Sequence, residues 1–241
     1  MSEGVVRGAN DPAYVRGQYA DELGLRARKS VYADVAGLDA RDVAFAAVVD
    51  ALPRRVLEVG CGEGEFARRL VHELDIELIA LDQSLRMVEL ARAAGVDARV
   101  GDVQQLPFPA GSFDVAVAAW MLYHVPDLDR GVAELARVLR PGGRLVAVTN
   151  YEDHLHEMFR LVGISRWELP FGGENGTQLL ARHFERVEHF DADGTVTFHD
   201  ADSVRGYLSS SERLAGYVDK VPELEEPVVA RRRPVVFVAD K

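Results

Sequence analysis

Cysteine is almost absent from this sequence, since Cys61 is the only one among 241 residues. A single cysteine excludes an internal disulfide and a zinc site built from several cysteines, and it agrees with a reducing compartment. Long apolar runs are missing too, because the longest, residues 115–122, is far shorter than a membrane span. The opening residues, MSEGVVRGANDPAY, do not join positive charge to an apolar stretch. We therefore expect a cytoplasmic protein with no membrane partner.

Positive charge is also scarce, with 28 Lys and Arg against 39 Asp and Glu and a net charge of −11. The overall field repels polyanions, so we do not expect nucleic acid as a partner. One compact basic run remains at residues 231–233, beside an expected edge strand. It is either a solvated turn or a local nucleic-acid contact.

Short apolar runs alternate with helical patterns between residues 55 and 150. The runs RVLEVG, ELIALD, FDVAVAAW and GRLVAVTN are rich in Val, Ile and Leu, and each precedes a segment with helical spacing. This alternation is typical of βαβ units, and residues 184–191 and 233–239 are expected to add a sixth and a seventh strand. The predicted fold class is therefore α/β, a Rossmann-like, doubly wound and mostly parallel seven-stranded sheet. Its strands present their carboxyl ends at one edge, where ligands bind.

Two further regions flank this core. Residues 1–52 contain a helix capped by Asp39 and an amphipathic segment with three tyrosines, and we expect an N-terminal helical cover over the ligand edge. The core then runs over residues 53–241 within one structural domain. Residues 192–230 are too many for a hairpin and include an expected helix at 202–208, so they are predicted to form a lid insertion before the last strand.

The stretch VLEVGCGEG places a buried strand directly before a glycine turn and a helix. Such a helix N-terminus usually binds phosphate. Here Glu58, Glu63 and Glu65 crowd the same place, and each carboxylate beside a phosphate would cost on the order of a few kcal/mol. Asp82 ends the second strand 22 residues after Gly60, where an acidic side chain can accept the hydroxyls of a ribose. The pattern indicates a nucleoside with a cationic tail.

Five sequence blocks follow the order and spacing of a known family. They are VLEVGCGEG, LD at Asp82, GDVQQLPFP, FDVAVAAWMLYHVPD and LARVLRPGGRLV. Together they resemble the class I S-adenosylmethionine-dependent methyltransferases, and most closely the small-molecule group that includes ubiquinone- and menaquinone-pathway enzymes. The resemblance covers residues 55–150 closely and the rest loosely. It implies an enzyme that uses S-adenosyl-L-methionine, releases S-adenosyl-L-homocysteine and requires no metal.

The resemblance also implies which residues contact the cofactor. Gly60 and Gly62 would let the backbone approach the methionine part, because a Cβ would block it. The remaining expected contacts divide between the methionine (Glu58, Cys61 and Ala119), the ribose (Asp82) and the adenine (Gln83, Met87, Asp102 and Val103). Met87 has an alternative in filling the apolar face of its helix, and Asp82 has one in capping that helix. Cys61 is expected to be a small turn residue without thiol chemistry.

His124 is the candidate catalytic residue, because it follows the fourth strand at the ligand edge. If the acceptor is a hydroxyl, a base must take its proton, and an imidazole with an ordinary pKa near 6.5 suits this role. The alternative is a histidine that structures the loop before Pro126. The residues expected to line the acceptor pocket are Tyr14, Tyr19, Trp120, Tyr123 and Asn150. Packing under the lid is the alternative for Trp120 and Tyr123, and Tyr151, His154 and His156 can reach the same edge.

Three functions fit these observations. The first is methyl transfer to an N or O atom of a small-molecule metabolite by in-line displacement. The second is methylation of RNA or protein, against which the acidic charge and the expected lid argue. The chain also has AWML where many nucleobase amino-methylating enzymes carry an Asn/Asp-Pro-Pro-aromatic motif. The third is a binding module that keeps the cofactor pocket without transfer, and the oligomeric state stays open in all three.

Overall fold

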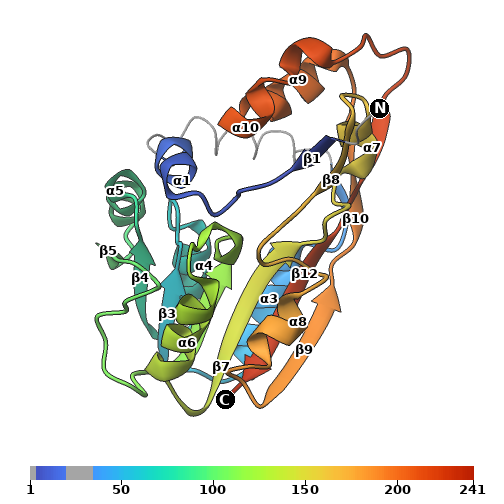
Figure 1. Cartoon of the computed structure of the whole chain (residues 1–241). Helices are drawn as coiled ribbons and strands as arrows, with labels where there is room; N and C mark the ends of the chain where they lie inside the picture. Colours follow the sequence, from blue (N-terminus) through green and yellow to red (C-terminus); the bar gives the residue numbers. More distant parts are fainter. Residues whose placement is uncertain (1–3, 20–34) are drawn as a thin grey trace.

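The computed structural model describes residues 4–19 and 35–241, and a seven-stranded sheet forms its centre (Figure 1). The strands lie in the order β5 (Ala98–Val100), β4 (Glu77–Asp82), β3 (Arg55–Val59), β6 (Phe113–Ala119), β7 (Leu139–Asn150), β12 (Pro234–Asp240) and β9 (Arg186–Asp191). The first five are mutually parallel, and β12 runs antiparallel to both of its neighbours. The predicted seven-stranded, mostly parallel sheet is confirmed. Its strand order reverses between β3 and β6, which places a crevice at their carboxyl ends.

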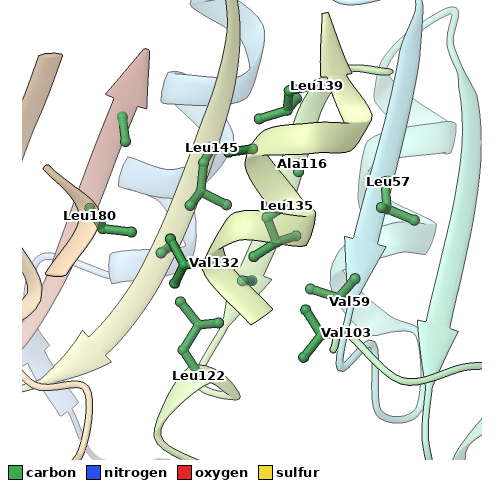
Figure 2. Close-up of a cluster of buried hydrophobic side chains, with 14 of the residues drawn as sticks. Leu57, Val59, Val103, Ala116, Leu122, Val132, Leu135, Leu139, Leu145 and Leu180 are labelled. Atoms are coloured by element: carbon green, nitrogen blue, oxygen red, sulfur yellow. The ribbon is translucent and has the colours of Figure 1, made fainter. Parts of the chain in front are cut away.

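Helices cover both faces of the sheet, because successive strand residues point to opposite sides. On one face α6 (Leu128–Val138) and α8 (Gly176–Leu180) pack over residues such as Leu57, Val59 and Leu145 (Figure 2). On the other face lie α3 (Ala40–Asp50), α4 (Glu65–Glu73) and α5 (Leu85–Ala93), which pack over residues such as Val56, Val115 and Val146. Each fully buried Val or Leu side chain contributes about 1.5–3 kcal/mol. The doubly wound arrangement is therefore confirmed.

Helix N-caps follow the local sequence. The side chains of Asp39, Ser84 and Asp127 accept hydrogen bonds from backbone N–H groups in the first turns of α3, α5 and α6. Helix α6 stops at Val138, before the Pro-Gly-Gly sequence at 141–143. Leu139 pairs with Phe113 of β6 and begins β7.

A second layer of structure, here called the cap, stands on the carboxyl edge of the sheet (Figure 1). It contains the strand pair β1 (Gly4–Val6) and β8 (Ile164–Trp167), and a sheet of β2 (Val35–Gly37), β10 (Gly194–Phe198) and β11 (Val228–Arg232). Its helices are α1 (Pro12–Gln18), α7 (His156–Arg160), α9 (Ala201–Ser209) and α10 (Glu212–Ala215). The cap has a hydrophobic core of its own, which includes Phe159, Phe198 and Tyr207.

Four separate parts of the sequence build the cap. Residues 4–18 and 35–37 belong to the expected cover and residues 192–230 to the expected lid, whereas residues 151–169 join the cap although no cover was expected from them. The helix capped by Asp39 differs from expectation, because α3 packs against β7 and β12 on a face of the sheet. Residues 1–3 and 20–34 of the expected N-terminal cover lie outside the described residues. Among the helices that the structure does describe, none is long and apolar enough to cross a membrane.

Gly194 lies at a crowded crossing of three cap strands, since it pairs with Gly37 of β2 and Arg232 of β11. A Cβ at this position would overlap the carbonyl oxygen of Ala36 and lie 2.9 Å from Nη2 of Arg232. We expect Gly194→Ala to lower the free energy of unfolding by about 1–3 kcal/mol in urea denaturation. The control is Gly206→Ala in α9, whose added Cβ would have no atom within 4 Å. This variant should be neutral or stabilised by up to about 1 kcal/mol, and equal losses in both variants would contradict the assignment.

Candidate functional site

A cavity of about 420 Å³ lies between the carboxyl edge of the sheet and the cap. Its floor comes from the turn after β3 and from the ends of β4, β6 and β7. Its roof comes from α1, from the segment around α7 and β8, and from α9 to β11. The volume suits a ligand of metabolite size.

The glycine turn after β3 forms one side of the floor. Gly60, Gly62 and Gly64 have φ of +68°, +54° and +78°, a left-handed conformation that favours glycine. A Cβ on Gly60 would lie 2.6 Å from the Cβ of Met121, so the turn also requires a close approach at this position. The Gly62 N–H donates to Oδ2 of Asp82 at 2.9 Å. The end of β4 therefore holds the turn in shape.

Carboxylates gather on the same floor. They are Glu58, Glu63, Glu65, Asp82 and Asp102. Glu58 is only 3% exposed, and its Oε2 has no hydrogen-bond partner among the residues that the structure describes. Burial, reinforced by the negative charge of Asp82, raises the pKa of Glu58 to about 8. An unsatisfied buried carboxylate oxygen on an acidic floor fits a ligand that carries a cationic hydrogen-bond donor.

Most residues expected to contact the cofactor lie on the cavity wall. Gln83, Val103, Ala119 and Cys61 line it together with the glycines and carboxylates. Burial raises the pKa of the Cys61 thiol, which keeps it protonated. Met87 does not fit its expected role, because it is fully buried and absent from the cavity wall. Its helix α5 turns this side chain into the protein interior with Val88 and Ala91, as core packing requires.

His124 lies in the 3-10 turn η1 (Leu122–His124), beneath α1. Its Nδ1 is 2.7 Å from the carbonyl oxygen of Ala9, and its Nε2 is 2.9 Å from the hydroxyl oxygen of Tyr19. Because a carbonyl oxygen only accepts, we assign the proton to Nδ1, so that Nε2 accepts from the Tyr19 hydroxyl. The rings of Tyr14 and Tyr123 lie 6.3 and 4.4 Å from the imidazole, centroid to centroid. The structure thus brings the candidate base and the three expected tyrosines together.

Trp120 and Asn150 meet at the ends of β6 and β7. The Trp120 Nε1–H donates to Oδ1 of Asn150 at 3.3 Å, and both residues line the cavity. Trp120 has a φ of +52°, held in part by the bond of its N–H to the Val148 carbonyl oxygen. The Arg41 guanidinium carbon lies 5.2 Å from the centroid of the Trp120 ring. Backbone strain in a non-glycine residue at a cavity wall is common at functional sites.

The cap adds cavity residues that the sequence analysis did not single out. They are Phe159, Trp167, Leu169, Tyr207, Ser211, Leu214 and Arg232. Of the residues expected near the edge, Tyr151 and His154 line the cavity, whereas His156 does not. Burial and the nearby charge of Arg232 lower the pKa of His154 to about 3. The period-two alternation of a strand through residues 231–233 could have predicted that the middle arginine faces inward.

Residues 57–147 match the family model described as Methyltransferase domain. This segment runs from β3 into β7 and includes the glycine turn, Asp82, Asp102 and His124. The match therefore covers the cavity floor but neither the cap nor its arginine.

Similar proteins match part of this chain. The 27-O-demethylrifamycin SV methyltransferase of Amycolatopsis mediterranei is 42% identical over 99 residues, which are 38% of this chain and 36% of the relative. The malonyl-[acyl-carrier protein] O-methyltransferase of Herminiimonas arsenicoxydans is 38% identical over 162 residues, 64% of this chain and 61% of the relative. The chain thus spans less than two thirds of either relative.

Among solved structures, the [4+2]-cyclase SpnF superimposes with a TM-score of 0.63 at 18% identity. The match covers 99% of this chain and 98% of that chain. At this identity the likeness shows the fold alone.

Glu58 should make the stability of the protein depend on pH. Its folded pKa of about 8 lies above the ordinary value of 4.5, so the folded protein binds the Glu58 proton more tightly than the unfolded chain does. The contribution of this proton to the free energy of unfolding is complete below about pH 4 and is lost as the pH rises to about 8. Glu58→Gln cannot titrate at this position. The difference in free energy of unfolding between this variant and the wild type should therefore favour the variant more at about pH 9 than at about pH 5, by more than about 1 kcal/mol. Urea denaturation at both values measures this. The exposed Glu185→Gln is the control, and parallel pH profiles for wild type and Glu58→Gln would contradict the assignment.

Proposed function

Because residues 57–147 form a class I S-adenosylmethionine-dependent methyltransferase domain, we propose that this protein transfers a methyl group from S-adenosyl-L-methionine to an N or O atom of a small-molecule metabolite. The observation that carries this proposal is the acidic, glycine-lined floor of the cavity beneath the cap. The printed names of the two relatives support the reaction class, since both are methyltransferases.

The floor fits the cofactor on independent grounds. The unpartnered Oε2 of Glu58 would accept a hydrogen bond from the methionine ammonium. Each Asp82 oxygen accepts one backbone N–H, from Gly62 or Ser84, and keeps a lone pair that would accept from a ribose hydroxyl. The remaining cofactor contacts of the proposal are Gly60, Cys61, Gln83, Asp102, Val103 and Ala119, all of which line the cavity.

The cofactor, when bound, supplies an electrophilic methyl group on a sulfonium. The residues of this chain would align the acceptor with that methyl group and exclude water, and no step in such a displacement calls on a metal. The floor carboxylates favour a positively charged ligand over its neutral product. The same charges would therefore hold the cofactor before transfer and release the product after it.

Tyr19 and His124 would handle the proton of a hydroxyl acceptor. With Nε2 of His124 engaged by the Tyr19 hydroxyl, the tyrosine oxygen is the atom placed to receive the acceptor proton as its own proton passes to Nε2. The carbonyl oxygen of Ala9, bonded to Nδ1, would stabilise the charged imidazole that results. This arrangement changes the sequence-based role of His124 from direct base to partner of Tyr19.

The cap would close the acceptor side, with residues 4–19 of the expected cover (1–52) and the lid (192–230) on one domain. The Tyr14 hydroxyl is 3.0 Å from Oγ of Ser211, and Nε2 of Gln18 donates to the carbonyl oxygen of Ser210 at 2.8 Å. These bonds join the two segments above the cavity. A cavity of about 420 Å³ beneath them favours a metabolite over folded RNA, and Tyr14, Trp120, Tyr123 and Asn150 would line the acceptor part.

Transfer of label tests the reaction class. The whole chain is incubated with methyl-labelled S-adenosyl-L-methionine and either a low-molecular-mass metabolite extract or ribosomal RNA. We expect label in a small molecule and none in RNA. Transfer to RNA alone would replace the proposal by its RNA alternative, and cofactor binding without any transfer would leave a binding module.

Asp82→Ala should weaken the binding of S-adenosyl-L-homocysteine by about 2 kcal/mol, because charge-assisted hydrogen bonds to a partly buried ligand are lost. Titration calorimetry measures the dissociation constant. Asp75→Ala, an exposed position before β4, should bind like the wild type. An unchanged constant in Asp82→Ala would remove the ribose assignment.

Tyr19→Phe and His124→Ala should each lower kcat by roughly 100-fold or more on a hydroxyl acceptor, with the affinity for S-adenosyl-L-homocysteine kept. The wild-type rate should also fall in acid, because a protonated imidazole cannot accept the tyrosine proton. Tyr217→Phe, at a cap residue that does not line the cavity, is the control. Near-normal turnover with a flat pH profile would return His124 to a structural role and favour an amine acceptor.

A further inference from the structure

Arg232 is a buried cation on the wall of the cavity, and only 8% of it is exposed. Its Nη2 donates to the carbonyl oxygen of Leu38 at 2.8 Å, and its Nε has no acceptor in the described part of the chain. The flanking arginines differ, because Arg231 pairs with Glu157 and Arg233 with Asp153, both at 2.8 Å. A buried guanidinium without an anion is unfavourable, so this position calls for a negatively charged ligand.

The charged groups near Arg232 interact with other residues. Asp39, which follows Leu38, caps α3 through the Arg41 N–H and lies 4.0 Å from the Arg41 guanidinium. Asp193, on the neighbouring strand end, lies 3.8 Å from Arg233. His154 remains uncharged, as its low pKa indicates, and its Nδ1 accepts from the Arg233 N–H. Residues 4–19 and 35–241 therefore offer no carboxylate in an ion pair with Arg232.

The cap sheet makes room for this arginine. Arg232 pairs with Gly194 of β10, which pairs in turn with Gly37 of β2, so neither β10 nor β2 carries a side chain at this level. The ideal Cβ of residue 194 would come within 2.9 Å of Nη2. Two glycines thus allow the guanidinium to lie buried against the strands.

A second buried donor belongs to a residue of the cavity wall. The Nε1–H of Trp167 has no acceptor among the described residues, and Trp167 lines the cavity with Phe159 and Tyr207. The cap end of the cavity therefore combines aromatic surface with two hydrogen-bond donors, Nε of Arg232 and Nε1 of Trp167, that have no acceptor among the described residues. These features suit the apolar body and the anionic group of one molecule.

Arg232 stands apart from the glycine turn. It ends β11, two residues before β12, and β6 and β7 lie between β12 and β3 in the sheet. Within the sheet, β12 and β3 are three strand spacings apart, about 14 Å. The cavity is therefore polarised, with carboxylates at the cofactor end and a cation at the cap end.

We propose that Arg232 binds a carboxylate of the methyl acceptor, so that the substrate is a small organic acid with an apolar or aromatic body. This inference rests on the proposed function and adds the substrate class to it. A planar guanidinium matches a carboxylate through two parallel N–H···O bonds, and Nε–H is still available for one of them. An acid held in this way presents its other end to the cavity floor, where the methyl group would be delivered.

Matched probes test the inference on the whole chain saturated with S-adenosyl-L-homocysteine. Calorimetry compares benzoate with benzamide, its neutral counterpart, and with phenyl phosphate. We expect the wild type to bind benzoate at least about 10-fold more tightly than benzamide. Arg232→Met should abolish this preference and Arg232→Lys should keep part of it. Arg231→Met, whose side chain is at the surface, should behave as the wild type.

Each other outcome has a defined meaning. Equal binding of benzoate and benzamide by the wild type overturns the inference, and a preference for phenyl phosphate over benzoate replaces the carboxylate by a phosphate. If S-adenosyl-L-homocysteine binding falls in both Arg232 variants while the benzoate preference stays, the arginine holds the carboxylate of the cofactor instead. A wild type that binds no S-adenosyl-L-homocysteine contradicts the proposed function, which separates that failure from failure of the Arg232 inference.

Discussion

The hydrogen bond from the Gly62 N–H to Asp82 is the contact on which the cavity floor depends. It joins the ends of β3 and β4 and holds a turn whose glycines no other residue could replace without strain. It also keeps a carboxylate beside Glu58, and burial of both groups raises both pKa values. Without a ligand, burial and mutual repulsion therefore favour the neutral form of these carboxyls. A cationic ligand would favour their charged form and would gain binding energy from the resulting ion pairs.

The groups of the cap differ in chemical character from the carboxylates of the floor. Aromatic rings, two buried donors and one cation face the carboxylates across an enclosed space. The arrangement depends on a fold in which the chain leaves the sheet after β7 and again after β9 to build the cap. Because the chain leaves both β7 and β9 at the carboxyl edge of the sheet, the cap that it forms there covers the ligand crevice.

The features that the sequence predicted correctly are strands and helix starts, which depend on residues close together in the chain. The apolar runs predicted the strands of the sheet, and Asp39 predicted a helix start because an N-cap depends on its next three residues. Met87 was misjudged because the periodicity of a helix does not say whether a buried side chain reaches a cavity. The pairing of Tyr19 with His124, across 105 positions, and the inward turn of Arg232 depend on cap packing, which no short stretch of sequence encodes.

The bond between Tyr14 and Ser211 also sets the order of events during synthesis, since it joins residues 197 positions apart. A ribosome adds about 5–20 residues per second, so α1 waits roughly 10–40 s for its partner in the cap. Contacts of this range are the slowest to form, whereas the parallel strands pair over shorter separations. The sheet and its acidic floor can therefore assemble on the nascent chain before the roof exists. The ability to enclose a ligand arrives last, only once the C-terminal part of the protein has emerged.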